Sequence, residues 1–402
     1  MYIYKAAVVG GGTMGGSIAQ VITFAGIPVV IKDIDQAAVQ KALDKVRSIY
    51  ESRVKKGKMT ASEIEPKIVL ASGTTSYDDF SDVDIVIEAV PEDIKIKKQV
   101  FKELDEVCPP STILATNTSA LSISEIAAAT KRPEKVIGMH FFNPAHVMKL
   151  VEVIPGLQTS EETVMDVMAF AESLRKLAVR VEECPGFLVN RLLMPYITEA
   201  VIALTEGAAT ATEIDQAMVN FGMPMGPFTL SDMLGLDVCY KVAQIMYDAY
   251  GPRMPVASLN FKLFEKGRLG QKTGAGFYDA DGSEKELQEI VQQIQKEEGL
   301  RKTSFSPERL LYLMINEAVL VLQEKIASAT DIDIAMMAGT GFPQELGGPL
   351  KYADKIGLDV VLDGLEKFKN ELGMRFWPAH LLKRMVAAGL LGEKTGRGFY
   401  TH

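Results

Sequence analysis

Short apolar runs alternate with stretches of helical periodicity along the first half of the chain. Helices are predicted over Thr13–Ala25 and, as a pair joined by a basic turn, within Gln36–Glu65. The predicted strands are Lys5–Val9, Pro28–Lys32, Lys67–Ala71, Ile85–Val90, Thr112–Ala115, Val136–Met139, Lys149–Ile154 and Ala178–Val181. Alternation of this kind is typical of a parallel sheet whose strands are connected by helices, so an α/β domain is expected.

The second half of the chain, beyond Cys184-Pro185-Gly186, keeps helical periodicity but loses the strand signals. This half also contains an internal repeat. Residues of Arg191–Asp215 recur 118 positions later in Arg309–Asp333, and residues of Gly226–Tyr278 recur 122 positions later in Gly348–Tyr400. A duplicated helical domain explains both offsets if its second copy carries four extra residues.

These boundaries divide the chain into four parts. We expect a dinucleotide-binding α/β domain of the Rossmann type over 1–183. Two tandem all-α domains follow over 184–282 and 304–402, and we call them the first and the second repeat. A polar linker that contains one helix is expected between them, over 283–303.

The composition is that of a globular protein, with 47% hydrophobic and 24% charged residues. No apolar run reaches the roughly 18 to 20 residues that span a bilayer, and no signal peptide precedes the first strand, so a cytoplasmic protein without membrane contact is expected. Neither the three cysteines nor the four histidines have the spacing of a disulfide framework or a metal site. The net charge of -9 argues against nucleic-acid binding, although a local basic patch can still bind an anionic small molecule.

A glycine-rich turn, Gly10-Gly11-Gly12-Thr13-Met14-Gly15, joins the first predicted strand to the first predicted helix. Gly10, Gly12 and Gly15 would let the backbone approach a pyrophosphate at the helix N-terminus. Asp33 lies 23 residues after Gly10, where its carboxylate can accept a hydrogen bond from a ribose 2′-OH and would repel the 2′-phosphate of NADP. NAD is therefore the predicted cofactor, although the neighbouring Lys32 weakens this preference and a glycine turn without a ligand is the alternative.

A histidine and a glutamate on successive strands are the candidates for proton transfer. His140 follows the strand Val136–Met139, at the edge where open α/β sheets place ligands. Glu152 lies in the apolar strand Lys149–Ile154, where an unpaired carboxylate would be costly. A histidine partner would resolve that cost and would fix the tautomer of the imidazole. A structural histidine and a strand-edge glutamate that faces water are the alternatives.

Three further sets of polar residues are candidates for substrate contacts. Ser119 ends the segment Asn117-Thr118-Ser119, which follows a strand at the same edge of the sheet. Asn190 begins the first helix of the second half, where a cap or packing role is the alternative. The basic turn contains Lys55 and Lys56, which either bind phosphate groups or form a solvated helix end.

The order of these segments resembles the L-3-hydroxyacyl-CoA dehydrogenase family, which includes 3-hydroxybutyryl-CoA dehydrogenases. The resemblance covers nearly the whole chain, and the doubled C-terminal part resembles the dehydrogenase part of multifunctional fatty-acid oxidation enzymes. It rests on Gly10–Gly15, Glu88–Glu92, Asn117–Ser119, His140–Pro144, Glu152–Ile154, Pro185–Arg191 and Lys272–Gly274.

This resemblance implies an enzyme that oxidises (3S)-3-hydroxyacyl-CoA to 3-oxoacyl-CoA with NAD+, in fatty-acid oxidation or butyrate-type metabolism. It implies His140 as general base oriented by Glu152, with Ser119 and Asn190 at the reacting carbon. The helical repeats would resemble the C-terminal domain of 6-phosphogluconate dehydrogenase, and Lys55 and Lys56 would bind CoA phosphates. The implied cofactor contacts are Gly10, Gly12, Met14, Gly15, Asp33, Val90, Glu92, Lys97, Ser119, Asn143 and Lys272.

The second repeat departs from the family pattern, because Glu308 stands at the position that matches Asn190. Single-copy relatives pair their helical domains across a dimer, so an internal pair could replace that contact. A monomer with an internal pseudo-dimer and a homodimer are therefore both open. Two other functions compete: a β-hydroxyacid dehydrogenase with a catalytic lysine, and a former dehydrogenase retained as a binding or structural protein.

Overall fold

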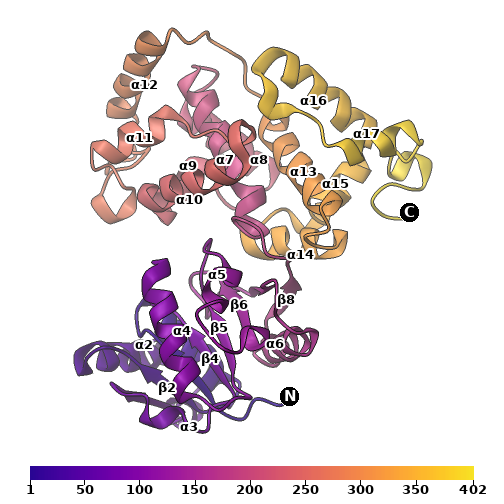
Figure 1. Cartoon of the computed structure of the whole chain (residues 1–402). Coiled ribbons are helices and arrows are strands. Elements are labelled where there is room, and N and C mark those ends of the chain that lie inside the picture. The colour runs from indigo at the N-terminus through magenta and orange to yellow at the C-terminus, as the bar shows by residue number, and fades with distance from the viewer. The chain divides into compact units, whose positions relative to one another are not determined.

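The computed structural model describes all 402 residues as two compact units, Met1–Phe187 and Leu188–His402 (Figure 1). The first unit is built around a sheet, and the second is built of helices. No helix in either unit combines the length and the apolar character needed to cross a membrane. The expected change from an α/β to a helical pattern is confirmed by this order of elements.

An eight-stranded sheet forms the centre of the first unit, in the order β3-β2-β1-β4-β5-β6-β7-β8. The six strands from β3 to β6 are parallel, but β7 runs antiparallel to β6, and β8 runs parallel to β7. The all-parallel expectation is therefore wrong at β7. The strands are β1 Ala6–Val9, β2 Val29–Lys32, β3 Ala71–Thr74, β4 Ile85–Glu88, β5 Ile113–Thr116, β6 Val136–Phe141, β7 Leu150–Pro155 and β8 Leu177–Arg180.

Helices connect these strands, and one of the helices extends into a segment that was predicted as a strand. Thr60 and Glu63 form a reciprocal capping box that begins α3, which then continues through Ile68. The strand predicted over Lys67–Ala71 is consequently wrong for most of its length, because β3 begins only at Ala71. The helices of this unit are α1 Thr13–Phe24, α2 Gln36–Lys55, α3 Ala61–Ile68, α4 Ile94–Val107, α5 Ile123–Ala127 and α6 Glu161–Ser173.

Two long helices, α7 Val189–Thr205 and α13 Pro307–Gln323, pack directly against each other in the second unit. Between the two repeats lies α12 Lys285–Glu298, the single helix expected there. The remaining helices are α8 Ala211–Phe221, α9 Pro227–Leu234, α10 Leu236–Tyr250, α11 Ser258–Glu265, α14 Ala329–Thr340, α15 Pro349–Ile356, α16 Leu358–Leu372 and α17 His380–Ala387.

Buried ion pairs cross between α7 and α13 in both directions. Arg191 of α7 donates to Glu317 of α13 over 2.8 Å, and Arg309 of α13 donates to Glu199 of α7 over 2.6 Å. Both guanidinium groups are fully buried, and each also reaches one further carboxylate. Because these four residues match one another through the repeat, the two repeats contribute equivalent halves of one network.

Replacing Arg309 with Met is expected to destabilise the helical unit by about 3 kcal/mol, because Glu199 and Glu206 lose a buried cationic partner. Urea unfolding followed by far-UV circular dichroism measures this change. The control is Arg47→Met, which removes a largely exposed pair with Glu65 and should cost less than about 1 kcal/mol. Equal losses in the two variants would contradict a stabilising role for the buried network.

Candidate functional site

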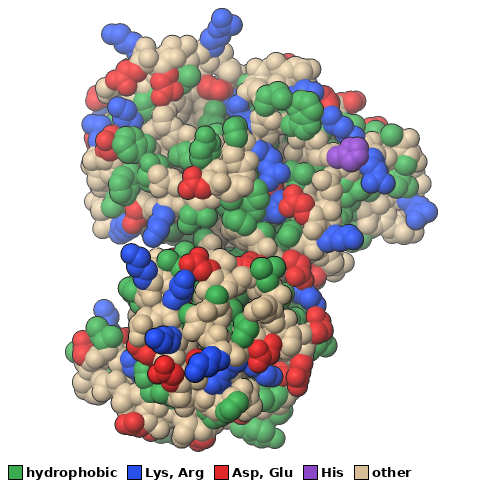
Figure 2. All heavy atoms as spheres, in the orientation of Figure 1, with side chains coloured by type: hydrophobic (Ala, Val, Ile, Leu, Met, Phe, Trp, Pro, Cys, Tyr) green, Lys and Arg blue, Asp and Glu red, His purple; other side chains and the backbone are tan.

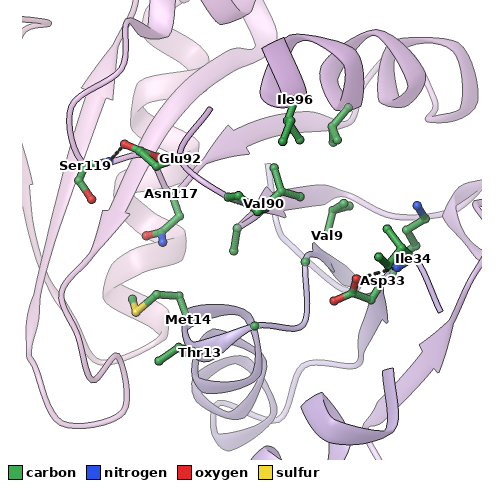
Figure 3. Close-up of a pocket in the computed structure, with 16 residues that line it drawn as sticks. Val9, Thr13, Met14, Asp33, Ile34, Val90, Glu92, Ile96, Asn117 and Ser119 are labelled. Carbon is green, nitrogen blue, oxygen red and sulfur yellow. Dashed lines mark hydrogen bonds between the residues drawn. The ribbon is translucent and has the colours of Figure 1, made fainter. Parts of the chain in front are cut away.

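A cavity of about 680 Å³ lies at the carboxyl ends of β1, β2, β4 and β5 (Figure 3). The strand order reverses between β1 and β4, and open α/β sheets bind ligands at such a point. All lining residues belong to the first unit: Val9, Gly10, Gly12, Thr13, Met14, Lys32, Asp33, Ile34, Ala89, Val90, Pro91, Glu92, Ile96, Val100, Asn117 and Ser119.

The three glycines of the turn are explained by different physical causes. A Cβ on Gly10 would lie 2.7 Å from the carbonyl oxygen of Ala89, and one on Gly15 would lie 1.8 Å from that of Gly10. Packing therefore demands glycine at these two positions. A Cβ on Gly12 would meet no atom within 4 Å, although Gly12 lines the cavity. The space beside Gly12 suits a ligand that comes close to the backbone.

The start of α1 is suited to an anion. Gly12 is the N-cap and provides no side chain to satisfy the first N–H groups of the helix, which begins at Thr13. These N–H groups and the positive end of the helix dipole favour phosphate. A pyrophosphate therefore fits the turn both by space and by charge.

Asp33 is held at the edge of the cavity by the backbone, as Figure 3 shows. Its carboxylate accepts the N–H of Gly11 over 2.7 Å and the N–H of Ile34 over 2.6 Å. The ammonium group of Lys32 lies 4.5 Å from the centre of the Tyr77 ring, a cation–π contact. Asp33 thus has a fixed position from which it could accept a hydrogen bond from a ribose hydroxyl.

Glu92 joins two loops on the opposite wall of the cavity. Its carboxylate accepts the hydroxyl of Thr118 over 2.6 Å and the N–H of Ser119 over 2.9 Å. Ser119 and Glu92 both line the cavity, as do Met14 and Val90 (Figure 3). The contact therefore fixes the loop after β5 relative to the loop after β4.

Lys97 does not line the cavity. Its ammonium group is 2.8 Å from Glu88 and 3.4 Å from Glu92, and only 1% of its side chain is exposed. Glu88 is fully buried and also accepts hydrogen bonds from Thr116 and the N–H of Val90. Lys97 thus supports the carboxylate wall from within the unit. Sequence reasoning named Glu88 only within the segment Glu88–Glu92 and gave it no role, although a glutamate in an apolar strand is the signal of a buried pair.

His140 and Glu152 lie directly opposite each other on β6 and β7. The Nδ1 atom of His140 is 2.7 Å from Oε2 of Glu152, and both side chains are buried. A carboxylate oxygen accepts a hydrogen bond, so this contact favours the tautomer with the hydrogen on Nδ1 and the lone pair on Nε2. The imidazole also packs beside Phe142 and Phe187, with ring centres 4.5 Å and 5.9 Å away.

Asn117 connects the cavity to the strand that carries His140. Its Oδ1 accepts the N–H of Phe141 over 2.8 Å, while the residue itself lines the cavity. Sequence reasoning noted Asn117 but assigned the substrate contacts to Ser119. Asn143, predicted along the cofactor, is exposed in the loop after β6 and is not among the lining residues.

The remaining predicted residues lie elsewhere. Asn190 is the second residue of α7, in the second unit. Lys272 pairs with Asp237, and Lys394 pairs with Asp359 at the matching positions of the second repeat. Lys55 and Lys56 are exposed at the end of α2. No group of three or more His, Cys, Asp or Glu side chains is arranged to hold a metal ion.

Two family descriptions match the chain. Residues 5–184 match "3-hydroxyacyl-CoA dehydrogenase, NAD binding domain". Residues 186–280 and 305–402 match "3-hydroxyacyl-CoA dehydrogenase, C-terminal domain". Together these matches leave uncovered only residues 1–4, residue 185 and the segment 281–304 around α12.

Among curated proteins, the chain is similar to the fatty acid oxidation complex subunit alpha of Shewanella amazonensis, with 41% identity over 96% of this chain and 56% of that protein. It is also 36% identical to the glyoxysomal fatty acid beta-oxidation multifunctional protein MFP-a of Cucumis sativus, over 98% of this chain and 56% of that protein. The chain thus spans a little over half the length of these relatives.

Among solved structures, 3-hydroxybutyryl-CoA dehydrogenase from Escherichia coli matches with a TM-score of 0.87 and 32% identity, over 96% of this chain and 99% of that one. The (S)-3-hydroxybutyryl-CoA dehydrogenase from Ralstonia eutropha matches with a TM-score of 0.68 and 42% identity, over 69% of this chain and 99% of that one. Both similarities extend over nearly the full length of the solved chains.

Gly12→Ala is expected to weaken NADH binding about tenfold. The added methyl group enters space that no protein atom occupies and that a pyrophosphate would fill. Its folding stability should change by less than about 1 kcal/mol, the range of an N-cap substitution. Gly15→Ala is the matched variant and should lose stability instead, since its methyl group meets the Gly10 carbonyl. NADH fluorescence titration and thermal unfolding measure the two effects, and unchanged NADH affinity in Gly12→Ala would contradict the pyrophosphate position.

Asp33→Ala is expected to reduce the preference for NADH over NADPH by about tenfold or more, because the carboxylate that would repel a 2′-phosphate is lost. Asp35→Ala is the control, since Asp35 caps α2 through the N–H of Ala38 and does not line the cavity. The ratio of the two dissociation constants is measured by fluorescence titration. An unaltered ratio in Asp33→Ala would remove Asp33 from cofactor selection.

Proposed function

Because the chain belongs to the 3-hydroxyacyl-CoA dehydrogenase family, we propose that it oxidises (3S)-3-hydroxyacyl-CoA thioesters to 3-oxoacyl-CoA with NAD+. The observation that carries this proposal is the buried His140–Glu152 pair, one strand away from a cavity that suits a dinucleotide. NAD+, when bound, supplies the acceptor for the hydride that leaves the alcohol carbon. The reaction would serve fatty-acid oxidation or butyrate-type metabolism.

His140 acts as the general base in this proposal. Its Nε2 lone pair takes the hydroxyl proton while the carbon loses a hydride, so the alcohol becomes a ketone. The resulting imidazolium carries a positive charge in a buried site. Glu152 compensates that charge over the 2.7 Å contact and keeps the ring in one orientation.

Other residues position the reactants. We assign Ser119 and Asn190 to the substrate around the reacting carbon. Gly10, Gly12, Gly15, Asp33, Met14, Val90 and Glu92 would contact the cofactor together with Ser119 and Asn143. Lys97 acts through Glu92, because its ammonium group faces that carboxylate rather than the cavity. Lys55 and Lys56 would face the CoA phosphates.

Lys272 is reassigned from the nicotinamide side to a structural role. Its pair with Asp237 has a counterpart in Lys394 and Asp359, although the second repeat has Glu308 where Asn190 would be needed. Because the same lysine–aspartate pair occurs in both repeats, a role in folding explains it better than a contact with the nicotinamide, which only the first repeat could make.

We further infer that the helical part is a tandem duplication resembling the C-terminal domain of 6-phosphogluconate dehydrogenase, divided at 184–282, 283–303 and 304–402. The reciprocal pairs Arg191–Glu317 and Arg309–Glu199 support this division. They bring the repeats together as an internal pseudo-dimer, which favours a monomer over a homodimer. The three cysteines are free and buried, as suits a reducing compartment such as the cytoplasm.

One assay tests the proposed function against its competitors. NADH consumption with acetoacetyl-CoA, but not with acetoacetate, is the expected result. Consumption with the free acid instead would indicate a β-hydroxyacid dehydrogenase. Consumption with neither substrate would indicate a former dehydrogenase retained for binding or structure.

His140→Gln is expected to lower turnover by about 100-fold or more, since glutamine cannot accept the alcohol proton. NADH should still bind, because His140 does not line the cavity. The control is His380→Gln, at the start of α17 in the second repeat, which should leave turnover unchanged. Steady-state rates with acetoacetyl-CoA decide the matter, and full activity in His140→Gln would remove this residue from the mechanism.

A further inference from the structure

A group of cationic side chains on the first unit has no carboxylate partner. None of the group forms a salt bridge within 4.0 Å, whereas other cations of the unit, such as Arg132 and Lys98, do. Cations and carboxylates are interspersed on the face of this unit that Figure 2 shows. The members of this group are Lys45, Arg53, Lys56, Lys67, Arg175 and Lys176.

Contacts with one aromatic ring bring three of these side chains together. Arg53, Lys67 and Arg175 surround the ring of Phe24, at 4.5, 5.1 and 5.4 Å from its centre. Phe24 ends α1, so the negative end of a helix dipole accounts for part of this attraction. It does not account for the buried Nε of Arg53, which has no hydrogen-bond partner. A buried donor without a partner in the protein can pair with an acceptor from outside it, either water or a bound anion.

His146 lies near Lys176, in the loop between β6 and β7. The carbonyl of Pro144 accepts the N–H groups of Val147 and Met148, which makes this loop a tight turn. Lys176 donates to the carbonyls of Ala145 and Met148 on either side of His146. The Nδ1 atom of His146 is buried and has no hydrogen-bond partner. Its backbone is therefore fixed while one ring nitrogen remains unsatisfied.

The largest charge effects on His146 come from cations. They are Lys45 and Arg53 on α2, Lys56 at its C-cap, and Lys176 ahead of β8. Burial and these cations lower the pKa of His146, so the ring is neutral at pH 7 in the free protein. Burial also lowers the pKa of Lys176, to about 8, so this ammonium group is charged below neutrality.

We propose that His146, Lys45, Arg53, Lys56 and Lys176 form a binding site for a phosphate dianion, and that His146 takes up a proton from the solvent when the anion binds. The anion brings two negative charges among four cations, so it removes the repulsion that keeps the ring neutral. The protonated ring then donates a charge-assisted hydrogen bond from Nδ1. No bond of the anion is broken, and the proton is released again when the anion leaves.

The inference rests on the proposed function for the source of the anion, because CoA itself carries a phosphomonoester on its ribose. Free inorganic phosphate has the same chemistry and is the other source. For either one, affinity should rise as the pH falls toward the pKa of the free His146 ring. A phosphate that carries a proton at pH 6.5 releases it on binding as a dianion, because its second pKa is about 6, while His146 takes one up. Binding to the unchanged protein should therefore take up more protons than binding to a variant without His146, at a pH where Lys176 is already charged.

Isothermal titration calorimetry at pH 6.5, in two buffers with different ionisation enthalpies, measures this proton uptake. The ligands are CoA, 3′-dephospho-CoA and inorganic phosphate. For the unchanged protein we expect proton uptake with CoA, and about tenfold weaker binding without uptake for 3′-dephospho-CoA. Uptake with inorganic phosphate alone would support the anion site and assign it to free phosphate.

His146→Gln is the decisive variant, because its amide can still donate a hydrogen bond but cannot titrate. It should bind CoA without proton uptake, and the control His380→Gln should behave like the unchanged protein. An equal net proton balance in His146→Gln and in the unchanged protein would overturn the proposal. Turnover of acetoacetyl-CoA, measured in parallel, separates this failure from failure of the proposed function.

Discussion

The antiparallel pairing of β7 with β6 is the constraint on which the site depends. It places Glu152 opposite His140 inside the sheet, where neither side chain could be buried without the other. A parallel β7 would need a long crossover before it could pair, whereas the loop from Phe142 to Lys149 returns the chain at once. That loop also carries His146, so a single reversal positions both the proposed general base and the proposed anion ligand.

Buried charges are used in a different way on each unit. Around the cavity, Lys97 is enclosed by Glu88 and Glu92, and the pairing gives the wall a fixed shape rather than a reactive group. In the helical unit, Arg191 and Arg309 cross between the repeats. Both arrangements carry a desolvation cost that is offset only when every partner is present. The buried charges of Lys97, Arg191 and Arg309 therefore fix the shape of the two units, and the side chains proposed for chemistry are different ones.

Local patterns predicted much of the fold and the site. The turn Gly10–Gly15 was recognisable because two of its glycines lie so close to other backbone atoms that no side chain would fit. Glu152 was predictable because a carboxylate in an apolar strand needs a partner. The orientation of the Lys97 side chain was not predictable from its own segment. Lys97 pairs with Glu88, which belongs to β4, a separate element. The unsatisfied ring of His146 likewise depends on α2 and Lys176, which are distant in sequence.

If the helical repeats are copies, as we propose, their differences separate folding from function. Asp215 and Asp333 accept backbone N–H groups and a tyrosine hydroxyl in the same way. Such contacts were kept on both sides because each repeat must fold. Asn190 was not kept, and Glu308 at its position is exposed, so folding places no demand on it there. A residue that only the first repeat retains is therefore better explained by the substrate than by the architecture, and this argument supports Asn190 independently of its location.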